Sequence, residues 1–233
     1  MFKKPTVLSF ESILEEYPSP IVTSKKIIPE WYKKIPKWNN NEIHTDNEGI
    51  NQTVKQCMPF LDALSCGYVA TLPYDLLVKD RNGSPFLIWN NDVEKTPGWR
   101  SKVAHENIVP LNHFPLEYTW NACVSFSVPK GYNMLVTHPL NRYDLPFTTL
   151  SGIIEGEYVV QPSGSFPFYI KHGFTGLIEQ GTPIFQIIPF KTESWESQKI
   201  EGLSKIGTTN QKASNLVFNG WYKNKFWTRK EYK

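Results

Sequence analysis

Two carboxylates set two residues apart are the first candidates for chemistry in this chain. Glu155 and Glu157 lie in the segment GIIEGEYVV, whose apolar residues indicate a β-strand. Residues i and i+2 of a strand point to the same face of a sheet. The pair could therefore hold a metal ion or act in acid–base catalysis. It could equally be a solvated strand edge, and we favour that structural interpretation.

The histidines offer a second possible metal site. His105 and His113 lie eight residues apart, with Glu106 and Glu117 nearby. The chain has no H-x-H, H-x-D or H-E-x-x-H spacing, which are the usual signatures of iron oxygenases, cupins and zinc hydrolases. We expect no metal ion to be bound.

Thiol and hydroxyl nucleophiles are weakly supported. The three cysteines Cys57, Cys66 and Cys123 form no C-x-x-C pair, which favours free thiols in a reducing compartment. Cys66 lies at the end of a predicted helix, where the helix dipole raises a thiol pKa and so disfavours a reactive thiolate. Neither G-x-S-x-G nor G-x-x-x-x-G-K is present.

Composition and length limit the class of protein that could position these groups. The chain has 233 residues, of which 40% are hydrophobic and 14% aromatic, enough for one well-buried domain. A formal net charge of +3 gives no reason to expect nucleic acid as a partner. We see no signal peptide and no apolar run of membrane-spanning length, so we expect a soluble protein made in a cytoplasm, without a membrane partner.

The two ends of the chain read as arms. Residues 1–50 form a Pro- and aromatic-rich N-terminal arm, irregular over residues 1–40 except for a short helix capped by Ser9 and ending at Tyr17. A polar loop is expected at residues 39–52. Residues 192–233 form a basic, aromatic C-terminal arm with a short helix near Glu193. Its aromatic side chains could stack on bases, or anchor on a neighbouring subunit while the lysines stay in water; we favour packing.

The middle of the chain, residues 51–191, predicts a mainly β domain. A helix is expected over residues 58–65, where Pro59 suits the first turn. The Asn-Gly of the turn at residues 80–83 predicts a β-hairpin between two apolar runs. The remaining strands are expected at residues 118–128, 132–137, 150–160, 166–171, 174–179 and 184–190. Turn signals at this spacing indicate a sandwich or barrel.

Three phrases resemble the trimeric dUTPase and dCTP deaminase superfamily, whose fold is a β-clip barrel. They are VPKGY at residues 128–132, GIIEGEY at 152–158 and GTPIFQ at 181–186. The resemblance spans residues 127–191. It implies a dUTPase-like β-clip or related barrel with terminal arms, assembled as a homotrimer.

The chemical positions of that family are altered here. The phosphate-binding segment is THPLNRYD, residues 137–144, which keeps an arginine, Arg142, but has no serines, and Pro139 lacks an amide donor. Glu155 stands where the family has a water-activating aspartate, and a displacement of ~1 Å can cost about a hundredfold in rate. The family's Gly-rich C-terminal arm is absent.

The chain also resembles proteins carried by marine phages, in the phrases IPEWYK at residues 28–33, CMPFLDAL at 57–64 and PIFQIIPF at 183–190. We therefore expect a non-catalytic phage structural protein, such as a cement, decoration, neck or tail subunit, located in the virion and made in the host cytoplasm. Its partners would be copies of itself, as a trimer, and other virion proteins. The residues expected to contact neighbours are Trp221, Tyr222, Lys223, Lys225, Phe226, Trp227, Arg229 and Lys230.

Two alternatives stay open: a nucleoside-triphosphate hydrolase or deaminase-like enzyme of the dUTPase class, and a small-molecule binding protein, either of them cytoplasmic. In the enzyme, the resemblance implies Glu155 as the base, Tyr158 stacked on the sugar, and Arg142 on phosphate, with Mg²⁺ bound alongside the nucleotide. That alternative requires Arg142, Glu155 and a basic covering residue to converge on one cleft, ideally at a subunit interface. The structural protein predicts a filled or closed site, and arms that project from the core.

Overall fold

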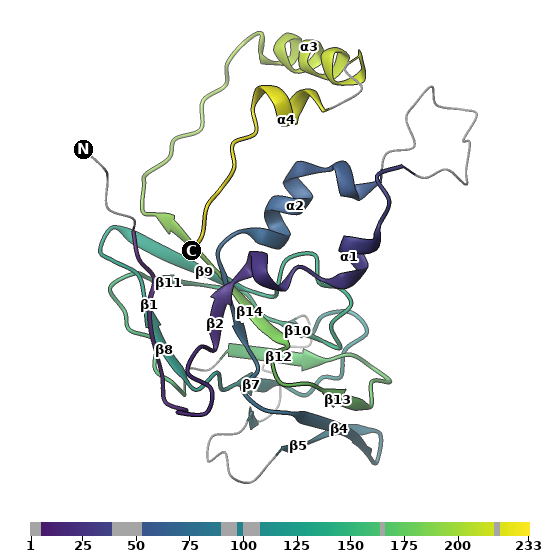
Figure 1. The fold of residues 1–233 in the computed structure, drawn as a ribbon, viewed down its shortest axis with the longest axis vertical. Helices are drawn as coiled ribbons and strands as arrows, with labels where there is room; N and C mark the ends of the chain where they lie inside the picture. Colours follow the sequence, from purple (N-terminus) through teal and green to yellow (C-terminus); the bar gives the residue numbers. More distant parts are fainter. Residues whose placement is uncertain (1–5, 39–52, 90–96, 100–107, 164–165, 217–219) are drawn as a thin grey trace.

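The computed structural model describes residues 6–38, 53–89, 97–99, 108–163, 166–216 and 220–233. Within these ranges the strands pair in antiparallel fashion into sheets of five, four, three and two strands (Figure 1). The expected mainly β class is confirmed. The ladders keep open edges and do not close into a barrel in the described part of the chain.

The five-stranded sheet is the framework on which the other elements are placed. Its order is β11 (Gly152–Glu155), β9 (Tyr132–Thr137), β14 (Pro183–Lys191), β3 (Tyr68–Thr71) and β2 (Ile21–Thr23). The central strand β14 pairs with β9 on one side and β3 on the other. Strands from both ends of the sequence therefore meet in one sheet.

The smaller sheets complete the β layers. The four-stranded sheet has the order β10 (Phe147–Thr149), β12 (Phe166–Ile170), β7 (Tyr118–Trp120) and β6 (Gly98–Trp99). The three-stranded sheet is β13 (Gly176–Ile178), β4 (Leu76–Arg81) and β5 (Ser84–Trp89), and β1 (Ser9–Ser12) pairs with β8 (Val124–Ser127). The predicted β4–β5 hairpin is confirmed: Asn82 and Gly83 have φ of 56° and 79°, as a type I′ turn requires.

Aromatic rings fill the space between the sheets. Trp120 stacks on Phe168 with ring centroids 3.5 Å apart, and Phe147 meets Trp120 edge-on at 4.7 Å. Phe166 lies against Phe185 of β14 at 4.2 Å. The Trp120 Nε1 donates to Thr149 Oγ1 at 2.8 Å, so burial of this indole leaves no unpaired donor.

Short helices pack against part of one face of the five-stranded sheet, where Gln186 of β14 donates to the carbonyls of Ala63 and Cys66. They are η1 (Ser24–Ile27), α1 (Glu30–Lys34), η2 (Val54–Gln56) and α2 (Met58–Ser65). The predicted helix over residues 58–65 is confirmed, with Pro59 in its first turn. Tyr32 of α1 stacks on Phe60 of α2 at 5.8 Å, which joins the two helices.

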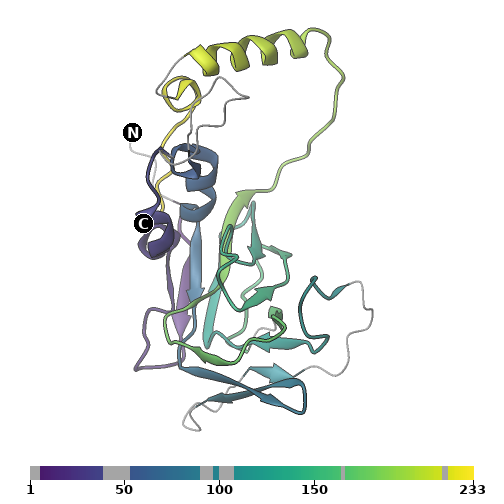
Figure 2. The same cartoon turned by 90° about the vertical axis from the view of Figure 1, so that its right-hand side faces the viewer.

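Two further helices stand at one end of the molecule. α3 (Leu203–Leu216) and α4 (Trp221–Lys225) lie beyond the end of β14, at the opposite end from the β13–β4–β5 sheet (Figures 1 and 2). An extended segment, residues 192–200, leads from β14 to α3. The chain then turns back through α4 towards α2.

Several local expectations were wrong. The helix expected from Ser9 to Tyr17 is instead strand β1, and residues 21–23 form a strand of the five-stranded sheet, because long-range pairing outweighs the local capping pattern. No helix forms near Glu193; the first helix after β14 is α3, which begins at Leu203. The strand expected at 118–128 is interrupted before Val124 by Cys123, whose φ is 53°. The loop expected at residues 39–52 lies outside the described residues.

Candidate functional site

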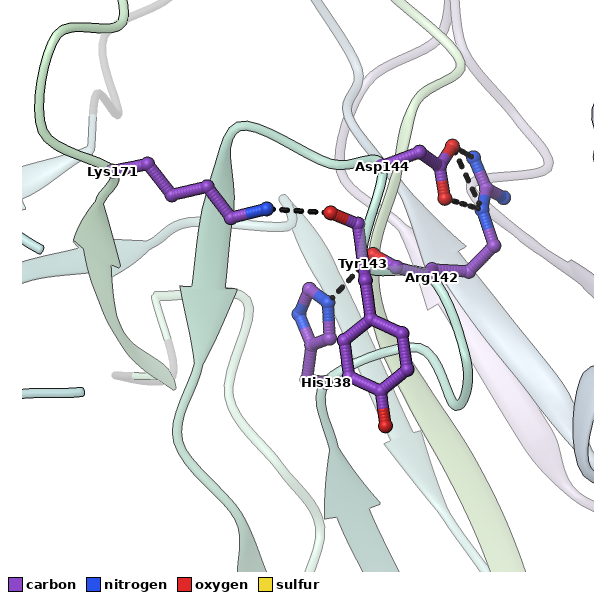
Figure 3. A network of polar contacts seen from close by, with 5 residues as sticks. All are labelled: His138, Arg142, Tyr143, Asp144 and Lys171. Atoms are coloured by element: carbon purple, nitrogen blue, oxygen red, sulfur yellow. Dashed lines mark hydrogen bonds and ion pairs between the residues drawn. The ribbon is translucent and has the colours of Figure 1, made fainter. Parts of the chain in front are cut away.

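The loop between β9 and β10 carries the arginine expected to bind phosphate. Arg142 Nε donates to both carboxylate oxygens of Asp144 at 2.9 and 3.2 Å, and Nη2 donates to Oδ2 at 2.9 Å (Figure 3). The Arg142 side chain is only 12% exposed. Burial alone would raise the pKa of the Asp144 carboxyl, but the guanidinium holds that pKa below its usual value. The Arg142 guanidinium is therefore already paired with the Asp144 carboxylate of the same loop.

His138 ties the same loop together. Its Nδ1 accepts the backbone N–H of Thr149 at 3.3 Å, so Nε2 carries the proton and donates to the carbonyl of Arg142 at 3.1 Å (Figure 3). Burial lowers the pKa of the His138 imidazole. On the other side, Lys171 Nζ donates to the carbonyl of Tyr143 at 2.6 Å. These contacts hold the loop over residues 138–146 in a closed arrangement.

The carboxylate expected to activate water lies at an exposed sheet edge. Glu155 is the last residue of β11 and is exposed. The Asn133 side-chain amide is oriented so that its nitrogen faces hydrogen-bond acceptors. This nitrogen donates to Glu155 Oε2 at 2.9 Å. Tyr158 follows in the turn, with its N–H on the Glu155 carbonyl at 3.1 Å, and its ring is largely in solvent. Glu155 and Tyr158 are thus close in the chain but enclose no site.

Arg142 and Glu155 are not brought together. Glu155 pairs with Asn133 at the start of β9, whereas Arg142 follows Thr137 at the end of that strand. Four residues of β-strand span ~13 Å. The expectation that Glu157 shares a strand face with Glu155 is also wrong, because β11 ends at Glu155 and Glu157 lies in the following turn, 3.6 Å from Lys130 Nζ.

The residue with the most buried polar contacts was missed as a site residue. Gln186 is 1% exposed; its Oε1 accepts the N–H of Leu140 at 2.8 Å, and its Nε2 donates to the carbonyls of Cys66 at 2.7 Å and Ala63 at 3.1 Å. This side chain joins β14, α2 and the Arg142 loop. The phrase GTPIFQ, residues 181–186, ends in Gln186, but nothing in the sequence indicated the partners of this side chain.

The C-terminal segment returns to its own chain. The indole Nε1 of Trp227 and the ammonium of Lys230 both contact the Asp62 carboxylate of α2, and the ring of Tyr232 lies 5.8 Å from that of Tyr68 in β3. Trp221 contacts Phe226 edge-on at 6.4 Å. The remaining predicted contact residues are exposed: Tyr222, Lys223, Lys225, Phe226 and Arg229.

Four cavities in the described part of the chain bear on the candidate residues. One, of about 480 Å³, lies between the start of α2 and α4 and is lined by Cys57, Met58 and Lys223. One of about 330 Å³ is lined by Leu8, Tyr132 and Tyr232, and one of about 300 Å³ by Phe86, Trp89 and Tyr118. None of these three is lined by Glu155 or Arg142, whereas a fourth, of only about 10 Å³, is lined by Arg142 together with Leu140 and Gln186.

The other candidate groups are dispersed. Across the described ranges, no three His, Cys, Asp or Glu residues are placed to hold a metal ion; His105 and Glu106 lie outside those ranges. Cys57, Cys66 and Cys123 are free thiols, and burial raises the pKa of Cys66. Among the described residues, no helix combines the length and apolarity needed to cross a membrane.

The sequence matches no protein-family model and no curated protein. Among solved structures, the chain is similar to a dUTPase of EIAV, with 13% identity, a TM-score of 0.32, and coverage of 84% of this chain and 98% of that one. It is also similar to dUTPases of the S. aureus phage phi11 and of Staphylococcus bacteriophage 80alpha. Both have 11% identity and a TM-score of 0.36, and the matches cover 84% of this chain and 97% and 88% of those chains. The dUTPase likeness noted in the sequence is thus found again. At TM-scores below 0.5 it says nothing about activity.

Proposed function

We propose that this chain is a non-catalytic structural protein that assembles with copies of itself, as a trimer. The observation that carries the proposal is the pairing of Arg142 with Asp144, at the far end of β9 from Glu155. A phosphate-binding arginine must present free N–H donors to the ligand. Here the Nε–H and an Nη2–H already donate to a carboxylate of the same loop, and the Arg142 side chain is only 12% exposed.

The arrangement of Glu155 supports the same proposal. A general base must lie within hydrogen-bond reach of the water that it activates, in a site that also holds the substrate. Glu155 is exposed at an edge strand and lines none of the four cavities described above. A scaffold role requires no such site.

The place of action that we propose is a phage particle, where the chain would contact other virion proteins after synthesis in the host cytoplasm. Peptides of this chain, recovered at a fixed copy number from purified particles, would support this location. Their absence from particles, with the protein abundant in the cell lysate, would contradict it.

Calorimetric titration tests the non-catalytic assignment directly. The purified chain is titrated with a non-hydrolysable dUTP analogue and Mg²⁺ while its mass in solution is recorded. We expect no heat of binding and a mass above that of the monomer. Micromolar binding that Glu155→Ala and Arg142→Ala abolish, and that Lys130→Ala leaves intact, would establish the nucleotide enzyme instead.

A further inference from the structure

The cavity of about 330 Å³ lies where both ends of the described chain meet the five-stranded sheet. Residues 6–8 contribute to its lining from the N-terminal side, and Glu231 and Tyr232 from the C-terminal side. The sheet and the turn before β9 contribute Tyr68, Val128, Tyr132 and Pro189. Small-molecule sites have volumes of roughly 300–1,000 Å³, so this cavity suits a small ligand.

Strand register explains why these side chains meet. Tyr132 and Met134 point to the same face of β9, and Pro189 of β14 lies directly opposite Met134. Tyr68 of β3 lies opposite Ile187, which precedes Pro189 by two residues and therefore shares its face. Met134 and Ile187 are fully buried. The cavity is thus an opening at the edge of the hydrophobic core.

Three tyrosine rings border this opening. The rings of Tyr68 and Tyr232 have centroids 5.8 Å apart and planes at 81°, so they form two walls of a corner. Tyr132 contributes the third ring. The hydroxyl of Tyr132 is 3.4 Å from Thr6 Oγ1, and that of Tyr68 donates to the carbonyl of Lys233 at 3.4 Å. Both of these hydroxyls are bound to the chain ends, so a ligand would contact mainly the rings.

The rings and one carboxylate determine which charge the cavity favours. The face of an aromatic ring carries the negative part of its quadrupole and attracts a cation within ~6 Å of the centroid. Glu231 is the one ionised side chain among the described residues that line the cavity. Lys233 Nζ is 3.8 Å from Glu231 Oε2, and the Lys233 side chain is 89% exposed, so this ion pair is weak. An anionic ligand would meet both the ring faces and the carboxylate and is disfavoured.

Two other lysines near the cavity are paired with carboxylates outside it. Lys230, two residues before Tyr232, contacts Asp62. Lys191, opposite Tyr132 in the ladder, lies 3.6 Å from Glu193. Neither lysine lines the cavity. The described lining therefore presents ring faces and one carboxylate, and no cation.

We propose that this cavity binds a small methylated ammonium cation. Tyr68, Tyr132, Tyr232 and Glu231, which we call the tyrosine cage, would surround its charge. Its methyl groups would pack on the apolar part of the lining, which consists of Val7, Leu8, Val128 and Pro189. A bare metal ion is a poorer match, because it needs several oxygen ligands and the cage offers one carboxylate. This site goes beyond the proposed structural role and does not depend on it.

Choline and a neutral analogue test the requirement for positive charge. The full chain is titrated calorimetrically with choline and with the alcohol in which a carbon atom replaces the choline nitrogen. The two molecules have nearly the same shape, so a difference in affinity reports the charge. We expect choline to bind at least roughly tenfold more tightly. Equal affinities, or no binding of either molecule, would overturn the proposal.

Two variants test whether choline binds in the tyrosine cage. Tyr232→Leu removes one ring and keeps an apolar side chain, and Glu231→Gln removes only the charge. We expect each to weaken choline binding roughly fivefold or more. Tyr158→Leu, at a tyrosine that is 58% exposed outside the cavity, is the matched control and should bind choline like the unmodified chain.

Glu231→Gln keeps the test decisive where Tyr232→Leu detaches the end of the chain. The Glu231 side chain is exposed and makes only the weak pair with Lys233, so its replacement should leave the fold intact, as circular dichroism would check. Choline binding that both variants leave unchanged would place the site elsewhere and overturn the tyrosine cage.

Vesicles distinguish the two sources of such a cation, a free molecule and a lipid headgroup. The chain is sedimented with phosphatidylcholine vesicles, and with phosphatidylglycerol vesicles as the control that lacks the methylated ammonium group. A chain that pellets only with phosphatidylcholine, and that excess choline releases, takes the headgroup as its ligand. A chain that binds choline but stays in the supernatant takes the free cation. Either result supports the tyrosine cage.

Discussion

Trp227 and Asp62 lie 165 residues apart in the sequence, yet the indole Nε1 donates to both oxygens of the Asp62 carboxylate at 3.1 and 3.0 Å. Lys230 contacts the same carboxylate. One aspartate of α2 therefore fastens the returning C-terminal segment to the core. The sequence singled out Trp227 and Lys230 as contact residues, but the partner is on the same chain.

Removal of this aspartate should release the C-terminal segment. A hydrogen bond to a charged group contributes about 1.5–3 kcal/mol, so Asp62→Ala should raise the population of the detached segment roughly tenfold or more. Trypsin cleavage at Lys225 and Arg229 measures that population. Asp75→Ala is the matched control, because the Asp75 carboxylate also accepts a hydrogen bond, here from the backbone N–H of Gln180, which lies outside the C-terminal segment. Equal cleavage rates for the two variants would show that Asp62 does not hold the segment.

Gln186 should be among the most costly polar residues to replace. Gln186→Leu leaves the Leu140 N–H and the carbonyl of Cys66 buried without this partner, at about 1–3 kcal/mol for each group. We expect urea denaturation to show a loss of about 2–5 kcal/mol. Gln180→Leu, which removes an exposed amide with one contact to the Pro73 carbonyl, should cost less than about 1 kcal/mol. A smaller loss for Gln186→Leu than for the control would contradict the bridging role.

His138 should make stability depend on pH. Burial lowers the pKa of its imidazole, so its contribution to stability is present above the unfolded-state value near 6.5 and is lost as pH falls through the lower folded-state value. Arg142, Asp144 and Lys171 are the charged groups around it. The depressed pKa of Asp144 acts in the same direction at lower pH, where protonation would end its pairing with Arg142.

The unfolding free energy should therefore decrease as pH falls below about 6.5, by at most ~1.4 kcal/mol per pH unit for one proton. His138→Asn keeps an acceptor for the Thr149 N–H but has no titrating group, so its profile should be flatter over this range. His172→Asn is the control, since the His172 ring lies against Phe114 and makes none of the loop contacts described for His138. Identical profiles for the native chain and His138→Asn would contradict the assignment.

Elements specified by local chemistry were predictable from the sequence. The β4–β5 hairpin follows from Asn82 and Gly83, which adopt positive φ readily, and α2 follows from Pro59 and the spacing of its leucines. Strand β1 was not predictable in this way. Residues 9–12 pair with 124–127, and nothing within a local window reveals a partner so far along the chain.

The arrangement of the candidate site residues was not predictable for the same reason, because it depends on contacts that a local sequence pattern does not reveal. The phrase around Glu155 correctly placed a strand, but only the register with Asn133 shows which end of β9 the carboxylate occupies. The position of Arg142 was readable, whereas its pairing with Asp144 two residues later was not, since an i, i+2 pair forms only in a loop of suitable shape. The helix α3 was missed because its composition is poor in helix formers.

The central position of β14 has a consequence for the order of events during synthesis. β14, residues 183–191, lies between β9 and β3. The middle of the five-stranded sheet can therefore form only after β14 has been synthesised. Until then, β3 with β2 and β9 with β11 each present an unpaired edge, which is a template for association with another nascent chain. The last strand to emerge is the one that closes both edges.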